Sequence, residues 1–127
     1  MTSGNSPKIK VLIVEDEETS LHVITLALQR HNRELFFARD GEEAVRLATS
    51  ERPDLIVMDM MLPKLDGFEA TRRIKEIPEL AAIPVVALTA RTGDFDEHKA
   101  REAGCADYIT KPYRIEHLRA RLAPYLG

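Results

Sequence analysis

The sequence has few of the features that would cross-link a protein or hold it in a membrane. Its 127 residues include a single cysteine, Cys105, so no disulfide can form within the chain. A lone cysteine fits a reducing compartment, and we expect a cytoplasmic protein. The longest apolar runs cover only a few residues, whereas a membrane-spanning helix needs about 20. These absences disfavour a disulfide-stabilised secreted domain and a membrane-spanning protein.

A signal-peptide pattern and a basic stripe are also missing. The opening residues, MTSGNSPK, lack the apolar run that follows the basic start of a signal peptide. Lysine and arginine are scattered along a chain of formal net charge -3, which argues against a nucleic-acid-binding face. Hydrophobic residues make up 44% of the chain and charged residues 31%, an ordinary globular balance. We predict a flexible polar tail at 1–7 and a single domain at 8–126.

Segments typical of strands alternate with segments typical of helices. KIKVLIV at 8–14 is rich in β-branched residues and almost continuously apolar, as a strand buried on both faces requires. The same reasoning predicts strands at 8–14, 34–38, 54–59, 83–90 and 106–109, and helices at 18–31, 42–51, 65–76, 94–103 and 114–126. Strands separated by helices imply parallel pairing. The predicted fold class is therefore α/β: a doubly wound (βα)5 domain with a five-stranded parallel sheet and helices on both faces.

Polar side chains follow four of the predicted strands. They are Glu15, Asp16 and Glu17 after the first strand, Asp59 at the end of the third, Thr89 at the end of the fourth, and Lys111 after the fifth. Ligands of doubly wound sheets bind beyond the carboxyl ends of the strands. We therefore expect these residues to form one cluster.

The chemistry of that cluster is suited to phosphoryl transfer. Crowded carboxylates favour a hard divalent cation, and Mg²⁺ combines a few carboxylates with phosphate oxygens. An ammonium group and a hydroxyl would stabilise the charge of the transferred group. A carboxylate nucleophile such as Asp59 would form an acyl phosphate.

Taken singly, each residue has a simpler explanation. An aspartate after a strand is most often a cap or turn former, and acids at 15–18 could complement a helix dipole. Asp40-Gly41 and Asp66-Gly67 are typical of turns and caps, and we assign them structural roles. The convergence of acids, hydroxyl and ammonium at the ends of different strands is what favours a functional site.

At these residues the sequence closely resembles the CheY-like receiver domain of two-component response regulators, whose fold is flavodoxin-like. The resemblance covers roughly 8–126. Four segments carry it: VLIVEDE at 11–17, DLIVMDMMLPKLDGFEA at 54–70, PVVALTA at 84–90 and GCADYITKP at 104–112. Their order and spacing make the resemblance specific.

The resemblance implies a role for each site residue. Asp59 would be the phosphoacceptor, and Lys111 would pair first with Asp59 and then with the phosphoryl group. Mg²⁺ (or Mn²⁺) would be bound by Asp16 and Asp59 directly, by Glu15 through water, and by the backbone carbonyl of Met61.

A second set of implied roles concerns switching. Thr89 would be the switch hydroxyl and Tyr108 the switch aromatic, and the Lys111-Pro112 bond would be cis. Met61 and Arg91 occupy positions that in this family influence how fast the phosphoryl group is lost.

The family also implies partners. The phosphodonor would be a histidine kinase or a histidine phosphotransfer protein, and a downstream protein would bind the face formed by residues 94–126. We expect a monomer or a weak phosphorylation-dependent dimer that contacts neither nucleic acid nor membrane.

Four alternatives compete with this interpretation; the sequence argues against the first two, and the last two stay open. Aspartyl-nucleophile phosphatases resemble an Asp-x-Asp pattern, but the second position here is Met61, which favours a self-phosphorylating, slowly self-dephosphorylating switch over a turnover enzyme. A nucleotide-binding domain needs a glycine-rich turn after the first strand, where this chain has EDEETS. The chain could instead be a receiver-like module that binds partners without phosphotransfer, or a receiver fragment of a hybrid histidine kinase or larger regulator.

Overall fold

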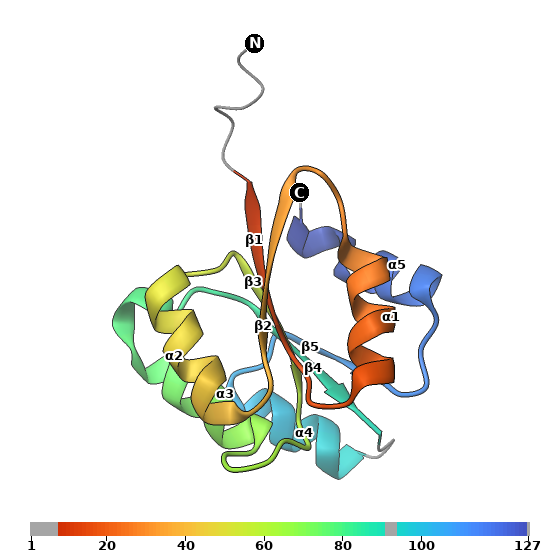
Figure 1. Cartoon of the computed structure of the whole chain (residues 1–127). Coiled ribbons are helices and arrows are strands. Elements are labelled where there is room, and N and C mark those ends of the chain that lie inside the picture. Colours follow the sequence, from red (N-terminus) through yellow and green to blue (C-terminus); the bar gives the residue numbers. More distant parts are fainter. Residues whose placement is uncertain (1–7, 91–93, 127) are drawn as a thin grey trace.

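A computed structural model describes residues 8–90 and 94–126 (Figure 1). The predicted tail at 1–7 and Arg91 lie outside the described residues. In chain order the elements are β1 (Ile9–Val14), α1 (Glu18–Leu28), β2 (Arg33–Ala38), α2 (Gly41–Glu51), β3 (Leu55–Asp59), α3 (Gly67–Glu76), the 3₁₀ helix η2 (Pro78–Leu80), β4 (Val85–Thr89), α4 (Asp94–Ala103), β5 (Asp107–Thr110) and α5 (Ile115–Leu126). The predicted alternation of strands and helices is confirmed.

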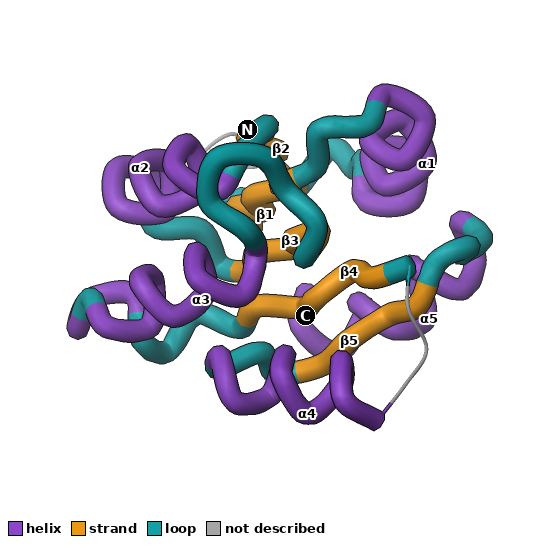
Figure 2. Tube along the Cα trace, turned by 90° about the horizontal axis from the view of Figure 1, so that it is seen from below, coloured by secondary structure: helices purple, strands orange, loops and turns teal. Residues whose placement is uncertain are grey.

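The strands form one parallel sheet in the order β2-β1-β3-β4-β5. Successive side chains of a strand point to opposite faces, so β1 sends Val11 and Ile13 to one core cluster and Leu12 and Val14 to the other. Helices α1 and α5 cover the first face, and α2, α3 and α4 cover the second (Figure 2). Burial on both faces explains why the central strands β1, β3 and β4 are almost continuously apolar, and the predicted doubly wound fold is confirmed.

Some element boundaries differ from the predicted ones. The helix predicted at 18–31 ends at Leu28, because Gln29 already has an extended backbone, and the backbone N–H of Arg33 then donates to Arg30 O at 3.1 Å in a turn. The helix predicted at 65–76 begins at Gly67, because the Asp66 carboxylate accepts from the Glu69 N–H at 2.9 Å. The strand predicted at 83–90 is shorter, and the one at 106–109 lies one residue later.

Both Asp-Gly pairs are helix starts, as predicted. The Asp40 carboxylate accepts from the Glu43 N–H at 2.8 Å and caps α2. Gly67 has a second use, because its N–H donates to Met60 O at 3.0 Å and a Cβ there would lie 2.5 Å from Asp59 O. A side chain at this position would push α3 away from the end of β3. The glycine therefore lets α3 start against the strand that carries Asp59.

Cys105 lies in the core. It is 7% exposed and belongs to the cluster beneath α2, α3 and α4. Burial raises the pKa of its thiol to about 11, so the unreactive thiol form prevails near neutral pH. Among the helices that the structure describes, none has the length and apolar character needed to cross a membrane.

Candidate functional site

The acidic residues predicted at the strand ends meet at one end of the sheet, onto which Figure 2 looks. Asp59 ends β3 and is 4% exposed, and Glu15 directly follows β1 and is 0% exposed. Strands β1 and β3 are parallel neighbours, so their carboxyl ends lie side by side. One carboxylate oxygen from each of Glu15, Asp16 and Asp59 lies within 4.8 Å of the others. The structure thus brings the predicted acidic cluster together.

Lys111 faces this cluster from the segment after β5. Its Nζ lies 3.2 Å from Asp59 Oδ2, to which it donates a hydrogen bond, and 3.3 Å from Glu15 Oε1. The Lys111 backbone N–H donates to Thr89 O at 2.6 Å, which fixes the start of this segment to the end of β4. The ammonium group is therefore held between two buried carboxylates.

The charges in the cluster do not balance. Burial, reinforced by the Asp59 carboxylate, raises the pKa of Glu15 to about 7. Burial acts to lower the pKa of Lys111, but attraction to Asp59 and Glu15 outweighs it and the pKa is raised. Glu15 Oε1 is also buried without a hydrogen bond. The cluster therefore favours an additional positive charge.

The Asp59 carboxylate is held on both oxygens. Oδ2 accepts from Lys111, and Oδ1 accepts from the backbone N–H of Met61 at 3.0 Å. The Met61 side chain is 58% exposed, while Met60 is buried. Both line a cavity of about 440 Å³ that also borders Thr89. That Met61 contributes a carbonyl ligand stays a prediction.

Thr89 and Tyr108 lie on neighbouring strands. Thr89 ends β4 and is 4% exposed. Tyr108 on β5 is half-buried and packs against the core cluster beneath α2, α3 and α4. Its backbone carbonyl accepts from Arg121 of α5 at 3.1 Å. The Lys111-Pro112 bond is cis. These positions suit the predicted switch pair, whose role stays a prediction.

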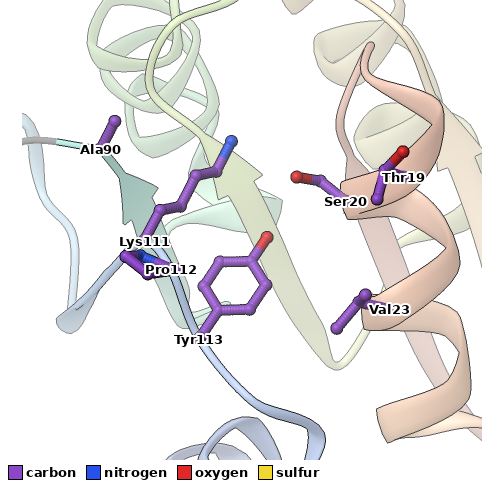
Figure 3. Close-up of a pocket in the computed structure, with 7 residues that line it drawn as sticks. All are labelled: Thr19, Ser20, Val23, Ala90, Lys111, Pro112 and Tyr113. Atoms are coloured by element: carbon purple, nitrogen blue, oxygen red, sulfur yellow. The ribbon is translucent and has the colours of Figure 1, made fainter.

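A larger cavity, of about 500 Å³, opens beside Lys111 (Figure 3). It lies between the first turns of α1 and the segment that follows β5. Its lining residues are Thr19, Ser20, Val23, Ala90, Lys111, Pro112 and Tyr113. Figure 3 shows the Tyr113 ring in the middle of this space, with the hydroxyl groups of Tyr113 and Ser20 directed toward each other. Burial raises the pKa of Tyr113 to about 12, so its hydroxyl stays protonated.

Sequence reasoning assigned no role to Tyr113 or Ser20. Their closeness in sequence to site residues could have indicated them: Tyr113 follows Lys111-Pro112, and Ser20 lies one turn after the acidic residues. Glu17, by contrast, stands among the strand-end acids but caps α1, accepting from the Ser20 N–H at 3.2 Å. It belongs to the helix start and not to the acidic cluster.

Comparison with known proteins identifies relatives over almost the whole chain. The sequence model of the response regulator receiver domain matches residues 11–123. The chain is 39% identical over 117 residues to the polar-differentiation response regulator DivK of Brucella anthropi, covering 92% of this chain and 95% of DivK. It is also 39% identical to the alkaline phosphatase synthesis transcriptional regulatory protein PhoP of Bacillus subtilis, covering 92% of this chain. It spans about half of PhoP (48%).

Solved structures show the same fold. The receiver domain of the sensor histidine kinase PA1611 from Pseudomonas aeruginosa, with a magnesium ion in its active site cleft, superposes with a TM-score of 0.85 at 35% identity, covering 94% of this chain and 98% of that domain. The chemotaxis response regulator CheY4 of Vibrio cholerae superposes with a TM-score of 0.87 at 28% identity, covering 94% of this chain and 99% of CheY4.

Proposed function

The chain belongs to the response regulator receiver domain family, and on that premise we propose that it is a switch that accepts a phosphoryl group on Asp59. Receiver domains are signalling modules of two-component systems and not turnover enzymes. The observation that carries the proposal is the arrangement around Asp59: its carboxylate is buried, held by Lys111 at 3.2 Å, and crowded by Glu15 and Asp16 within 4.8 Å. Such a perturbed cluster marks a site adapted to chemistry.

The residues fit a divalent metal ion. When all three carboxylates are ionised, one ammonium leaves two negative charges unbalanced, and the buried Glu15 Oε1 has an ion pair with Lys111 at 3.3 Å but no hydrogen bond. Oxygen-only ligands of this kind suit Mg²⁺ or Mn²⁺. We assign the ion to Asp16, Asp59 and the Met61 carbonyl, with Glu15 acting through water. When bound, it would neutralise charge on the carboxylates and on the incoming phosphoryl oxygens.

In the proposed transfer, an Asp59 carboxylate oxygen attacks the phosphorus of a phosphohistidine. The new O–P bond forms as the N–P bond breaks, and the donor imidazole leaves with the electron pair. Lys111 then moves its hydrogen bond from Asp59 to a phosphoryl oxygen, and the Met61 N–H keeps the other carboxylate oxygen in place. Positioning and charge neutralisation supply most of what phosphoryl transfer needs.

The proposed donor is a histidine kinase or a histidine phosphotransfer protein. The histidine side chain of the donor must reach Asp59 at the carboxyl end of the sheet. The cavity of Figure 3 borders Lys111, which binds Asp59, at this end. The exposed Met61 side chain supports a lasting signal, because it offers no carboxylate to activate water two residues after the nucleophile.

The conformational change would be transmitted from Asp59 through Thr89 to Tyr108. A phosphoryl group adds about -1.5 to -2 charges, and the Thr89 hydroxyl would donate to one of its oxygens. Tyr108 would then turn inward, and the α4-β5-α5 face would change its shape for a protein target. The free protein should already sample both states, with phosphate shifting their populations. NMR of the 94–126 amides with a phosphate mimic and Mg²⁺ tests this, and changes confined to the immediate pocket would refute it.

The phosphoacceptor is tested by incubating the protein with a small phosphodonor and Mg²⁺ and measuring the intact mass. We expect one added phosphoryl group, lost in Asp59→Asn and prevented by a chelator. Asp54→Asn is the matched control, because Asp54 precedes the same strand at its other end and binds the Lys10 N–H at 2.8 Å. If several donors and a competent kinase all leave the mass unchanged, the protein is instead a partner-binding module without phosphotransfer.

A further inference from the structure

Three arginines converge on a pocket at the end of the sheet opposite to Asp59. This arginine pocket lies between the end of α1, the loop that leads into β2, and the last turns of α5, which Figure 1 shows at the same end of the molecule. Its volume is about 200 Å³, and its lining residues are Ala27, Leu28, Arg30, Arg33, Arg119, Ala123 and Leu126.

Two of the arginines cap α1. Arg119 of α5 donates from Nε to Ala27 O at 3.1 Å and from an Nη to Leu26 O at 3.2 Å. Arg33 donates from an Nη to Leu28 O at 3.0 Å. The last carbonyls of a helix need such partners, and positive charge there complements the helix dipole. Capping therefore accounts for Arg33 and Arg119.

Capping does not account for the remaining donors. The Arg30 side chain makes no hydrogen bond or ion pair within residues 8–90 and 94–126, and Arg33 Nε is buried without a partner. None of the ion pairs found among the described residues involves Arg30, Arg33 or Arg119. Burial, with repulsion from Arg30 and Arg119, lowers the pKa of Arg33. Three positive charges thus share one pocket without a carboxylate partner among the residues that the structure describes.

We propose that the arginine pocket binds a phosphate dianion, either free or carried by a small molecule. Guanidinium groups present planar, fixed N–H donors that match phosphate oxygens. The α1 carbonyls beside the pocket already accept from Arg33 and Arg119, so an incoming anion meets N–H groups and not bare oxygens. The site is independent of Asp59 and does not rest on the proposed phosphotransfer.

The size of the pocket selects a compact ligand. At roughly 30 Å³ per water, a space of about 200 Å³ holds six or seven waters, enough for one phosphate group and its nearest atoms. An acidic protein segment would need a longer groove. Ala123 and Leu126 give the pocket an apolar wall, against which the carbon atoms of a phosphate monoester could pack.

The first experiment is an NMR titration of the protein with inorganic phosphate at constant ionic strength. A chelator is present throughout, so that no metal can draw phosphate to the acidic cluster. We expect saturable shifts in the Arg33 and Arg119 Nε–H signals and in the amides of 28–33 and 119–126, with none at 59–61. Equal shifts with chloride or acetate, or shifts centred on Asp59, would overturn the proposal.

A second titration distinguishes the two sources of phosphate. Glycerol phosphate that binds more tightly than inorganic phosphate would assign the pocket to a small phosphate monoester. Binding of inorganic phosphate alone would assign it to the free ion. Either result supports the site. If neither inorganic phosphate nor glycerol phosphate binds, the proposal is overturned.

Arg30→Gln is the variant of choice, because it removes one charge and no hydrogen bond of the fold. We expect phosphate to bind about tenfold more weakly, the usual scale for losing one charge-assisted hydrogen bond. Arg46→Gln is the matched control, since Arg46 is 70% exposed on α2 and pairs with Glu43. If Arg30→Gln binds phosphate as tightly as the unmodified protein does, the pocket is not the site.

Discussion

At the carboxyl end of the sheet three carboxylates crowd around one ammonium, whereas at the amino end three guanidinium groups gather around the last carbonyls of α1. Two of the acids, Glu15 and Asp59, are buried while Asp16 is exposed, and Glu15 is fully buried with a pKa raised to about 7. The arginines stay partly hydrated, and two of them complete a helix. The hydrophobic effect explains neither arrangement. The crowded carboxylates of the acidic end cost stability, as the proposed phosphoryl transfer would require, while two arginines of the basic end contribute to stability.

The largest expected effect comes from removing the ammonium at the acidic end. Lys111→Met leaves Glu15 and Asp59 without their shared cation, so we expect the free energy of unfolding to fall by ~3 kcal/mol in chelator. Urea unfolding at pH 7 measures it, with Lys64→Met as the control because Lys64 is 66% exposed. Equal losses in the two variants would mean that Lys111 does not hold the acidic end together.

The second effect is a pH dependence that only the acidic end should show. Glu15 has a folded-state pKa of about 7 against an ordinary 4.5, so the folded protein keeps a proton that the unfolded chain releases. The stability linked to this proton is complete below pH 4.5 and is lost as the pH rises to 7.

We expect this loss to be about 2 kcal/mol in chelator, since one unit of pKa shift corresponds to 1.36 kcal/mol and the ionised carboxylate can adjust toward Lys111. Urea unfolding across this range measures it. Glu15→Gln should flatten the slope. Arg33→Gln should leave it unchanged, because guanidinium groups stay protonated throughout. A slope that survives in Glu15→Gln belongs to other groups.

A smaller effect, of opposite sign, should follow when a carboxylate is removed. Asp59→Asn relieves repulsion with Glu15 and Asp16, and we expect a gain of ~1 kcal/mol in chelator. The gain should vanish when Mg²⁺ is added, since the unmodified site then binds the ion and the variant binds it poorly. Thermal unfolding with and without Mg²⁺ gives both numbers. Asp54→Asn, at the other end of the strand, should show neither change.

The difference between the two ends also explains what the sequence could predict. The acidic site follows a topological rule, because the carboxyl ends of parallel strands meet and polar residues directly after them are brought close together. Asp59 and Lys111 are 52 residues apart, yet each is located by counting from a strand. The central strands β1, β3 and β4 were predictable because burial on both faces makes them almost continuously apolar.

No such rule exists for the arginine pocket. Arg33 and Arg119 meet because α5 packs against α1 beside the start of β2, which is a matter of tertiary packing. The same contacts explain why the helix predicted at 18–31 stops at Leu28: the arginines supply partners for its last carbonyls from outside the helix. Side-chain orientation was likewise beyond the sequence for Tyr113, which points into the cavity beside Lys111.

The smallest effect tests whether the basic end can be altered without touching the chemistry. Arg119→Met keeps the apolar stem but removes the hydrogen bonds to Ala27 O and Leu26 O, and we expect a loss of ~1 kcal/mol. Arg46→Met, which changes an exposed arginine of α2, should cost less than half as much. The rate at which a small donor phosphorylates the protein should be the same in both variants and in the unmodified protein. If Arg119→Met slows that reaction, the two ends of the sheet are coupled through α1 and α5, and the separation of chemistry from stability drawn from their charges is wrong.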